Sequence, residues 1–374
     1  MVARPRATAF LLLAGLVPAA PALAASSLHA NAGGPARRQA WKAVYPSWRR
    51  AEPLSAHVHR IDAEIEGARL RPLTGQNRSL SGTTPKLLVQ DPNGRTFLAK
   101  AKDPVNLNFE RELFATRLRQ AAGEPTVPVV SKSIDLEAGR RFDGYVKPML
   151  PAQGPLAPDP AQWTLAQRNV VLADHVWAEF LGNDDTHRLQ SIVLHAPGMT
   201  EPGSMNIDWD RSLLDYRRTR PLSRFRQGTP SPPAHNLLYR SYVRGTLDLD
   251  FGPSFDAIER IHGLSDQEIR DALGPFLDRV FEAPGRGYGP YPTRDALVQA
   301  VLARRDRLRD QFEVFVRSLM DERAQRLARS PRPPRMRQIL ADLRDGKMWL
   351  ANRVLGSAAV SRVMQSMRRL QGEP

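Results

Sequence analysis

The sequence predicts an α+β protein of two lobes, in which a strand-rich first lobe is followed by a helical second lobe. Short apolar runs separated by turn residues fill the first part of the chain, whereas longer segments with apolar residues at helical spacing fill the second part. A stretch with four prolines, residues 151–160, separates the two parts. We therefore expect the first lobe to span residues 58–150 and the second lobe to span residues 151–329.

The first lobe is expected to contain a hairpin and one helix. The turn at 91–94 reads Asp-Pro-Asn-Gly between two apolar runs, and Asn-Gly in that position is a strong hairpin signal. Leu113, Phe114 and Leu118 then recur at helical spacing until Gly123 ends the pattern. In chain order, the expected elements are strands from Val58 onward, strands at 87–89 and 96–99, a helix over 109–121, and strands at 127–130 and 142–146.

The second lobe is expected to begin with a long amphipathic helix over residues 165–181. Two short apolar runs follow it and predict strands. Beyond a loop rich in Pro and Arg, at 221–233, the pattern becomes helical again. The remaining expected elements are strands at 192–194 and 205–207, helices over 266–281 and 293–329, a linker at 330–334, and a basic amphipathic helical tail within residues 330–374.

The N-terminus has the features of a secretory signal peptide, which we expect to span residues 1–24. Arg4 and Arg6 precede an apolar stretch at 9–17, and Ala22-Leu23-Ala24 supplies a small-x-small cleavage site. The stretch is shorter than the ~20 residues that span a bilayer. We expect a flexible leader over 25–57 and export to the periplasm or the exterior, with an uncleaved anchor as the alternative.

The composition narrows the classes of function. The chain has no cysteine, which excludes disulfides, thiolate nucleophiles and cysteine-ligated zinc. No Gly-x-Ser-x-Gly sequence occurs, which disfavours a serine hydrolase. The formal net charge is +15, and residues 330–374 hold nine Lys and Arg against three Asp and Glu. This balance favours anionic partners such as a nucleotide, or an anionic membrane surface contacted by the tail; no specific nucleic acid is predicted.

A loop that precedes the first strand of the hairpin has features of a phosphate-binding loop. Gly82 lies beside the small hydroxyl residues Thr83 and Thr84, so backbone N–H groups could approach a polyphosphate. Lys86 could neutralise the negative charge of that ligand. The loop lacks the Gly-x-x-x-x-Gly-Lys-Ser/Thr pattern of a Walker loop. Taken alone, such a cluster also fits a plain turn.

A lysine and a glutamate are candidates for a phosphate clamp. Lys100 ends the second strand of the hairpin, and Glu112 lies one turn into the following helix. In protein kinases a strand lysine holds the α- and β-phosphates and is fixed by a helix glutamate. Lys102 and Glu110 lie only two residues away and remain alternatives to the first pair.

The loop after the long helix holds candidates for a base and for metal ligands. Asp185 follows the end of the helix, and Gln190 comes five positions later. Kinase catalytic loops place the base aspartate and a metal-binding amide at this spacing. Asp208 then follows an apolar run, where a second metal ligand would lie, and Asp210 is its alternative. We expect His187 to orient this loop.

These residues resemble the HipA-like and phosphatidylinositol-kinase-like branch of the kinase superfamily, from Ser79 to Asp210. The phosphate loop is similar to Ser-x-x-Gly-x-x-x-Lys, and the sequence from Gly182 is similar to Gly-Asn-x-Asp-Arg-His-x-x-Asn. The resemblance implies a two-lobed protein-kinase-like fold, ATP and Mg²⁺ as cofactors, and transfer of the γ-phosphate to a hydroxyl of a protein or small molecule. It implies that Asp185 is the base and that Gln190 and Asp208 are metal ligands.

Two residues depart from the pattern of that branch. Thr186 stands where the branch has Arg, and Gln190 stands where it has Asn. Gln keeps the amide oxygen but is one methylene longer, which shifts or weakens a metal site. The alternative is therefore a nucleotide-binding pseudokinase or scaffold whose basic tail contacts a membrane or a partner. Transfer of another part of the nucleotide, as in adenylylation, is a third reading.

Overall fold

The computed structural model describes residues 54–73, 84–124, 126–136, 139–150, 152–183, 185–194, 203–217, 233–282 and 287–328. Several sequence predictions lie outside these ranges. They are the signal peptide at 1–24, most of the leader, Gly82 and Thr83 of the expected phosphate loop, nearly all of the Pro/Arg-rich loop, and the tail at 330–374. Within the described ranges, no helix is long and apolar enough to cross a membrane.

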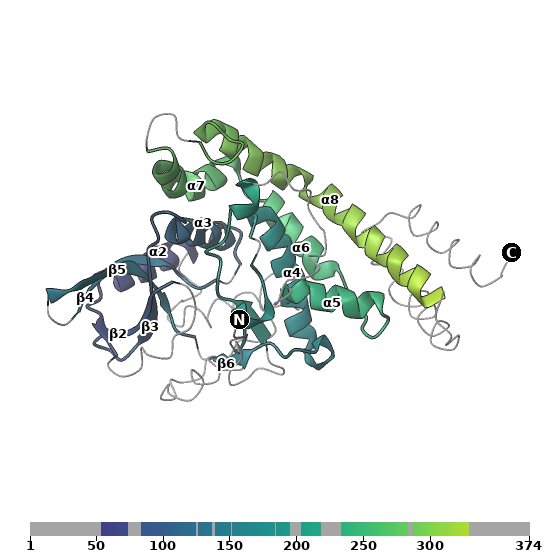
Figure 1. Ribbon diagram of the computed structural model, residues 1–374, viewed down its shortest axis with the longest axis horizontal. Helices are drawn as coiled ribbons and strands as arrows, with labels where there is room; N and C mark the ends of the chain where they lie inside the picture. Colours follow the sequence, from purple (N-terminus) through teal and green to yellow (C-terminus); the bar gives the residue numbers. More distant parts are fainter. Residues whose placement is uncertain are drawn as a thin grey trace, which may run out of the picture.

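The predicted α+β architecture of two lobes is confirmed, with a strand-rich first lobe and a helical second lobe (Figure 1). The first lobe has an antiparallel sheet in the order β1-β2-β3-β5-β4. Two helices accompany this sheet. The elements are α2 (Leu54–Gly67), β1 (Arg71–Pro72), β2 (Lys86–Gln90), β3 (Thr96–Ala101), α3 (Asn108–Ala121), β4 (Val130–Asp135) and β5 (Arg141–Pro148).

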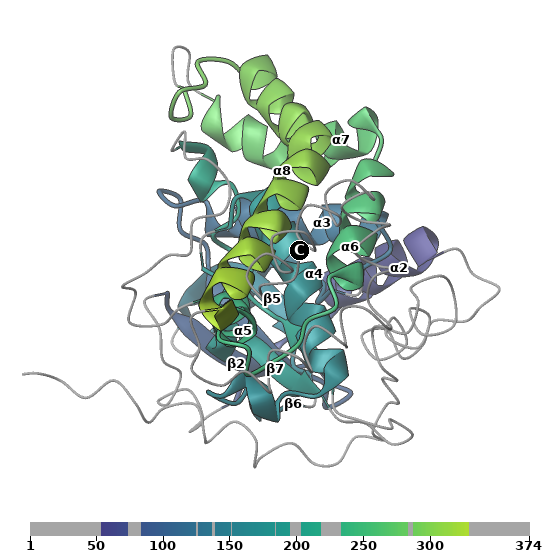
Figure 2. The ribbon, with the colours of Figure 1, turned by 90° about the vertical axis from the view of Figure 1, so that its right-hand side faces the viewer.

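The second lobe combines a small antiparallel sheet, in the order β6-β7-β8, with helices that share one large apolar core. Figure 2 shows the long helix α8 lying along the other helices of this lobe. The elements are β6 (Ala152–Pro155), η3 (Pro160–Gln162), α4 (Leu165–Leu181), η4 (Arg188–Gln190), β7 (Ser191–Leu194), β8 (Gly203–Asn206), η5 (Leu214–Arg217), α5 (Ala234–Val243), α6 (Gly252–His262), α7 (Asp266–Val280) and α8 (Arg294–Ala328).

The expected hairpin is present, and its register positions the candidate site. Asp91 Oδ1 accepts hydrogen bonds from the backbone N–H groups of Asn93 and Arg95, at 3.0 and 2.8 Å. Gly94 adopts φ +80°, a left-handed conformation that glycine allows at little cost. The turn sets Gln90 opposite Thr96, and the same register brings Lys86 opposite Lys100.

Two strand predictions in the first lobe are wrong. Residues from Val58 onward form helix α2, in which the buried Ile61 and Ile65 lie four positions apart on one face. The strand expected at 127–130 begins only at Val130, where pairing with β5 starts, and continues to Asp135. Val127 and Val129 are buried without being part of that ladder. Apolar burial therefore occurs there without strand pairing.

Helix α4 carries the chain to the candidate catalytic loop. Thr164 and Gln167 form a reciprocal capping box at its start, and Gly182 ends it at φ +64°. A Cβ atom on Gly182 would lie 2.7 Å from the ring of Tyr216, so only glycine fits at this position. The Leu181 carbonyl accepts a hydrogen bond from the Leu213 N–H at 2.7 Å. The end of α4 is thereby tied to the segment that follows Asp208 and Asp210.

Replacing Asp62 by Asn is expected to stabilise the protein at neutral pH. Burial raises the pKa of Asp62 to about 6, although Arg117 acts to lower it. Its Oδ1 atom is buried and has no hydrogen-bond partner among the described residues. Since the folded pKa exceeds the unfolded one, the charged form costs stability above pH 6, and this cost vanishes toward pH 4. We expect a gain of roughly 1–2 kcal/mol at pH 7.5.

Urea unfolding of both proteins at pH 5 and pH 7.5 measures this effect. Glu64→Gln is the matched control, because Glu64 lies on the same helix and its side chain is 41% exposed. The variant therefore removes a carboxylate that water already reaches. An equal gain in the control, or a gain that does not grow with pH, would contradict the assignment.

Candidate active site

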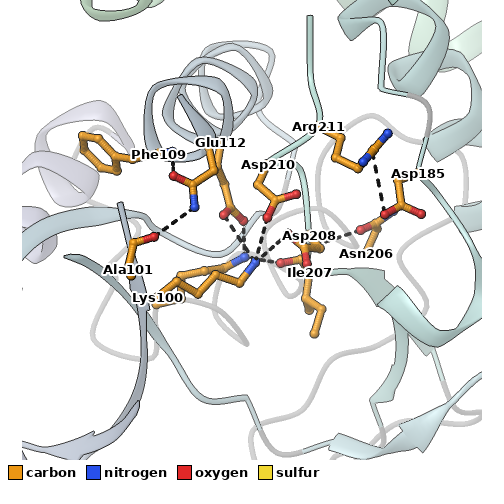
Figure 3. Close-up of polar contacts among 12 residues, drawn as sticks. Lys100, Ala101, Phe109, Glu112, Asp185, Asn206, Ile207, Asp208, Asp210 and Arg211 are labelled. Carbon is orange, nitrogen blue, oxygen red and sulfur yellow. Dashed lines mark hydrogen bonds and ion pairs between the residues drawn. The ribbon is translucent and has the colours of Figure 1, made fainter. Parts of the chain in front are cut away.

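Lys100 of β3 lies at the centre of a buried polar cluster that joins the two lobes (Figure 3). Its ammonium donates to Asp208 Oδ1 at 2.7 Å and lies 3.4 Å from Asp210 Oδ2. It also forms a longer ion pair with Glu112 Oε2 of α3, at 3.8 Å. The lysine, the glutamate and the aspartate named by the sequence prediction are thus brought together.

A second lysine, Lys147 of β5, belongs to the same cluster and was not predicted. Its ammonium donates to Glu112 Oε1 and to the backbone carbonyl of Ile207. Glu112 therefore receives a hydrogen bond from Lys147 and only a longer ion pair from Lys100. The sequence shows only that Lys147 directly follows the strand expected at 142–146, and this does not reveal its partners.

The carboxylates of Glu112, Asp208 and Asp210 offer oxygens that all lie within 4.8 Å of one another. Burial would raise the pKa of Asp208, but the charges of Lys100 and Lys147 outweigh it and hold this pKa at about 2. Burial, together with the charge of Asp208, raises the pKa of Asp210 to about 6. Burial alone would lower the pKa of Lys100, but Glu112 and Asp208 raise it above its ordinary value.

The donor set of this cluster fits a divalent cation. Glu112 Oε2 is buried and has no hydrogen-bond partner among the described residues, and the same is true of Gln190 Oε1. The Gln190 carbonyl accepts from the Ile207 N–H at 3.0 Å, so η4 lies beside the segment that leads to Asp208. Carboxylate and amide oxygens are the ligands that Mg²⁺ prefers. Glu112, Asp208 and Asp210 therefore offer a set of oxygens suited to Mg²⁺, and Gln190 lies on the neighbouring turn η4.

The described part of the expected phosphate loop leads into this cluster. Lys86 begins β2 directly opposite Lys100, and Thr84 lies two residues earlier. Burial lowers the pKa of Lys86, and so does the positive charge of Lys100, while Asp208 acts to raise it. Lys86 is thus a further cation at the edge of the cluster.

Asp185 lies in the loop after α4, on the other side of Asp208 from Lys100 in the view of Figure 3. Its backbone N–H donates to Asn183 Oδ1 at 2.9 Å, which fixes the loop. Its carboxylate lies 3.6 Å from His187 Nε2 and 3.9 Å from Arg211 Nε. The side chain is 36% exposed, so an incoming group can reach it. Arg211 is a neighbour that the sequence prediction did not include.

The alternatives to Lys100 and Glu112 lie elsewhere. Lys102 donates to Ser131 Oγ at 2.6 Å, and its ammonium lies 4.4 Å from the centre of the Phe109 ring. Glu110 pairs with Arg279 of α7 at 3.9 Å. Lys102 follows the last residue of β3, and its side chain contacts β4 and α3 rather than Asp208.

No protein-family model matches the chain, and no curated protein matches it. The fold is similar to that of the proinflammatory kinase CtkA of Helicobacter pylori, with 12% identity and a TM-score of 0.34, over 66% of this chain and 94% of that one. It is also similar to the Rio2 kinase of Chaetomium thermophilum, solved with ADP/Mg²⁺ and phosphoaspartate, with 11% identity and a TM-score of 0.23, over 72% and 76%. Both TM-scores are below 0.5, so the functional assignment depends on the residues of this chain.

Proposed function

We propose that the protein is a kinase-like phosphotransferase that binds ATP with Mg²⁺ and transfers the γ-phosphate to a hydroxyl group of a protein or small molecule. The observation that carries this proposal is the buried cluster in which Lys100 and Glu112 of the first lobe meet Asp208 and Asp210 of the second. Charged groups are seldom buried in proteins unless they are paired. A buried lysine among three carboxylates is suited to binding a polyphosphate and its metal.

Each side chain has a role that its position supports. Lys100, with Lys86 at the edge of the cluster, would bind the phosphate oxygens. Asp208, Asp210 and Gln190 would hold Mg²⁺, which when bound neutralises charge between the phosphates. Glu112 orients the lysines from helix α3. The roles of Lys100, Asp208 and Gln190 are those that the sequence resemblance implies, and Asp210, which was the alternative to Asp208, is added to them.

Asp185 would accept the proton of the acceptor hydroxyl. A new bond forms between the acceptor oxygen and the γ-phosphorus, the bond from this phosphorus to the bridging oxygen breaks, and ADP leaves. Asn183 holds the backbone of Asp185, and His187 lies beside its carboxylate. His187, beside this carboxylate, would orient it. The exposure of Asp185 leaves room for the acceptor.

Thermal unfolding with and without Mg²⁺-ATP tests the proposal. We expect the intact protein to melt roughly 5 °C higher at a 100-fold excess of Mg²⁺-ATP over Kd. Asp208→Asn should lose the part of this shift that depends on Mg²⁺, because it removes a metal-facing charge. Asp143→Asn is the matched control, since its carboxylate on β5 is 72% exposed and pairs with Arg141 instead of a residue of the cluster. Absence of a metal-dependent shift in the intact protein would rule out the kinase, and absence of any shift with ATP would rule out the pseudokinase as well.

The second candidate function is a nucleotide-binding pseudokinase, which the substitution of Gln190 for the expected Asn favours. The product released from ATP distinguishes the possibilities. ADP release that is stimulated by an acceptor indicates phosphotransfer, whereas pyrophosphate release indicates adenylylation. Binding without release of either product, across a panel of protein and small-molecule hydroxyls, indicates the pseudokinase.

A further inference from the structure

Glu112 contacts two lysines, and the two contacts differ in kind. Lys147 Nζ donates a hydrogen bond to Glu112 Oε1, whereas Lys100 Nζ lies 3.8 Å from Oε2, beyond hydrogen-bonding distance. The hydrogen bonds of Lys100 go instead to Asp208 Oδ1, at 2.7 Å, and to Asp210 Oδ2, at 3.4 Å. Building on the proposed function, we infer that Lys147 is the positioning residue that fixes Glu112 and the segment before Asp208, which leaves Lys100 available to the nucleotide phosphates.

Burial explains why Glu112 needs a permanent partner. The side chain of Glu112 is 1% exposed, and that of Lys147 is 6% exposed, so water cannot replace either partner. Asp208 and Asp210, the hydrogen-bonded partners of Lys100, are 23% and 18% exposed. Loss of the cation beside a buried carboxylate strongly destabilises the folded protein. Beside a partly exposed carboxylate the loss costs less, because water can hydrate the charge. Lys100 can therefore leave Asp208 and Asp210, which water can reach, at a smaller cost than Lys147 can leave Glu112.

The second contact of Lys147 extends its effect to the metal-facing segment. Its ammonium donates to the carbonyl of Ile207, the residue directly before Asp208. One charged group thus joins strand β5, helix α3 and the segment that follows β8. Movement of either neighbour away from Lys147 would break a buried contact. The position of Asp208 is accordingly set from the first lobe.

The sheet register places the two lysines so that this division of roles is possible. Lys147 lies opposite Leu98, and Lys100 lies two residues further along the same strand as Leu98. Residues two apart on a strand share a face, so Lys100 and Lys147 are diagonal neighbours on one face of the sheet. Both ammonium groups can reach Glu112, but only Lys147 also reaches the Ile207 carbonyl.

The first experiment compares Lys147→Met with Lys100→Met, without ligand and with Mg²⁺-ADP. We expect Lys147→Met to lower the melting temperature of the free protein by roughly 10 °C, and Lys100→Met to lower it by much less. For Mg²⁺-ADP we expect Lys100→Met to weaken binding at least ~10-fold, because it removes a phosphate contact. A free protein that Lys100→Met destabilises as much as Lys147→Met would overturn the inference.

Two further variants keep the test decisive if Lys147→Met does not fold. Lys147→Met combined with Glu112→Gln removes both charges, so it should recover most of the lost melting temperature. Lys147→Arg keeps the charge and should be more stable than Lys147→Met. If the double variant is no more stable than Lys147→Met, then the ion pair with Glu112 is not what Lys147 supplies.

The dependence of ADP binding on Mg²⁺ measures the positioning role of Lys147. A loss of packing alone would not change this dependence. Relative to Glu112→Gln, the double variant should need ~10-fold more Mg²⁺ for half-maximal ADP binding, while ADP binding without Mg²⁺ stays the same. Equal Mg²⁺ requirements would overturn this role. If the intact protein binds no Mg²⁺-ADP, then the proposed function fails, and the melting temperatures without ligand still decide whether Lys147 fixes Glu112.

Discussion

Asp185→Asn is expected to lower the rate of phosphoryl transfer by about 10²–10⁴-fold while the affinity for Mg²⁺-ADP stays within about twofold. Asn has the size of Asp but cannot accept the proton of the acceptor hydroxyl. The carboxylate of Asp185 lies beside His187 and Arg211 rather than in the cluster around Lys100. Its loss should therefore affect the chemical step and spare binding. Single-turnover rates and nucleotide titration measure the two quantities separately.

Asp208→Asn serves as the contrasting variant for Asp185→Asn, because it should weaken Mg²⁺-dependent binding as well as transfer. Arg211→Met tests whether the neighbouring guanidinium contributes to the same step, with Asp185 intact. If Asp185→Asn transferred phosphate at the rate of the intact protein, then Asp185 would not be the base. If it lost Mg²⁺-ADP binding as Asp208→Asn does, then its carboxylate would belong to the metal site instead.

Local sequence signals predicted those elements whose boundaries are encoded by neighbouring residues. Helix α4 covers the expected residues because a capping pair starts it and Gly182 ends it. The hairpin was predictable because its turn chemistry and the apolar runs on both sides agree. Lys100, Glu112 and Asp208 could be named because each lies near the end or the start of such an element, in the order of the family pattern that the sequence resembles.

The remaining features depend on contacts between distant parts of the chain. Lys147 is buried because of Glu112 and Ile207, which lie 35 and 60 positions away in the sequence. Strand alternation could show that Lys147 faces one side of the sheet, but it could not show what lies there. Helix α2 was missed since its two apolar anchors, Ile61 and Ile65, have a spacing that also fits one face of a strand.

A buried ion pair near the junction of the lobes leads to the largest expected effect on stability. Arg119 of α3 donates to Asp174 of α4 at 2.8 Å, and both side chains are buried. The guanidinium lies 4.6 Å from the ring centre of Trp209 and 5.4 Å from that of Trp177. Asp174 also accepts from the backbone N–H of Asn206, two residues before Asp208. The pair therefore links both lobes to the segment that leads to Asp208.

Arg119→Met should destabilise the protein by about 3–5 kcal/mol at pH 7.5, because Asp174 is left buried without its cation. Burial already raises the pKa of Asp174, and Arg119 acts to lower it. Loss of Arg119 raises this pKa further, so the penalty should shrink as pH falls and the carboxyl group is protonated. Denaturant unfolding between pH 5 and pH 8 measures this dependence.

Two further variants serve as controls for Arg119→Met. Arg117→Met, at an exposed position of the same helix, should cost far less stability. Adding Asp174→Asn to Arg119→Met should restore part of the lost stability. Equal losses in the Arg117 and Arg119 variants would show that helix propensity, rather than the buried charge, sets the stability here.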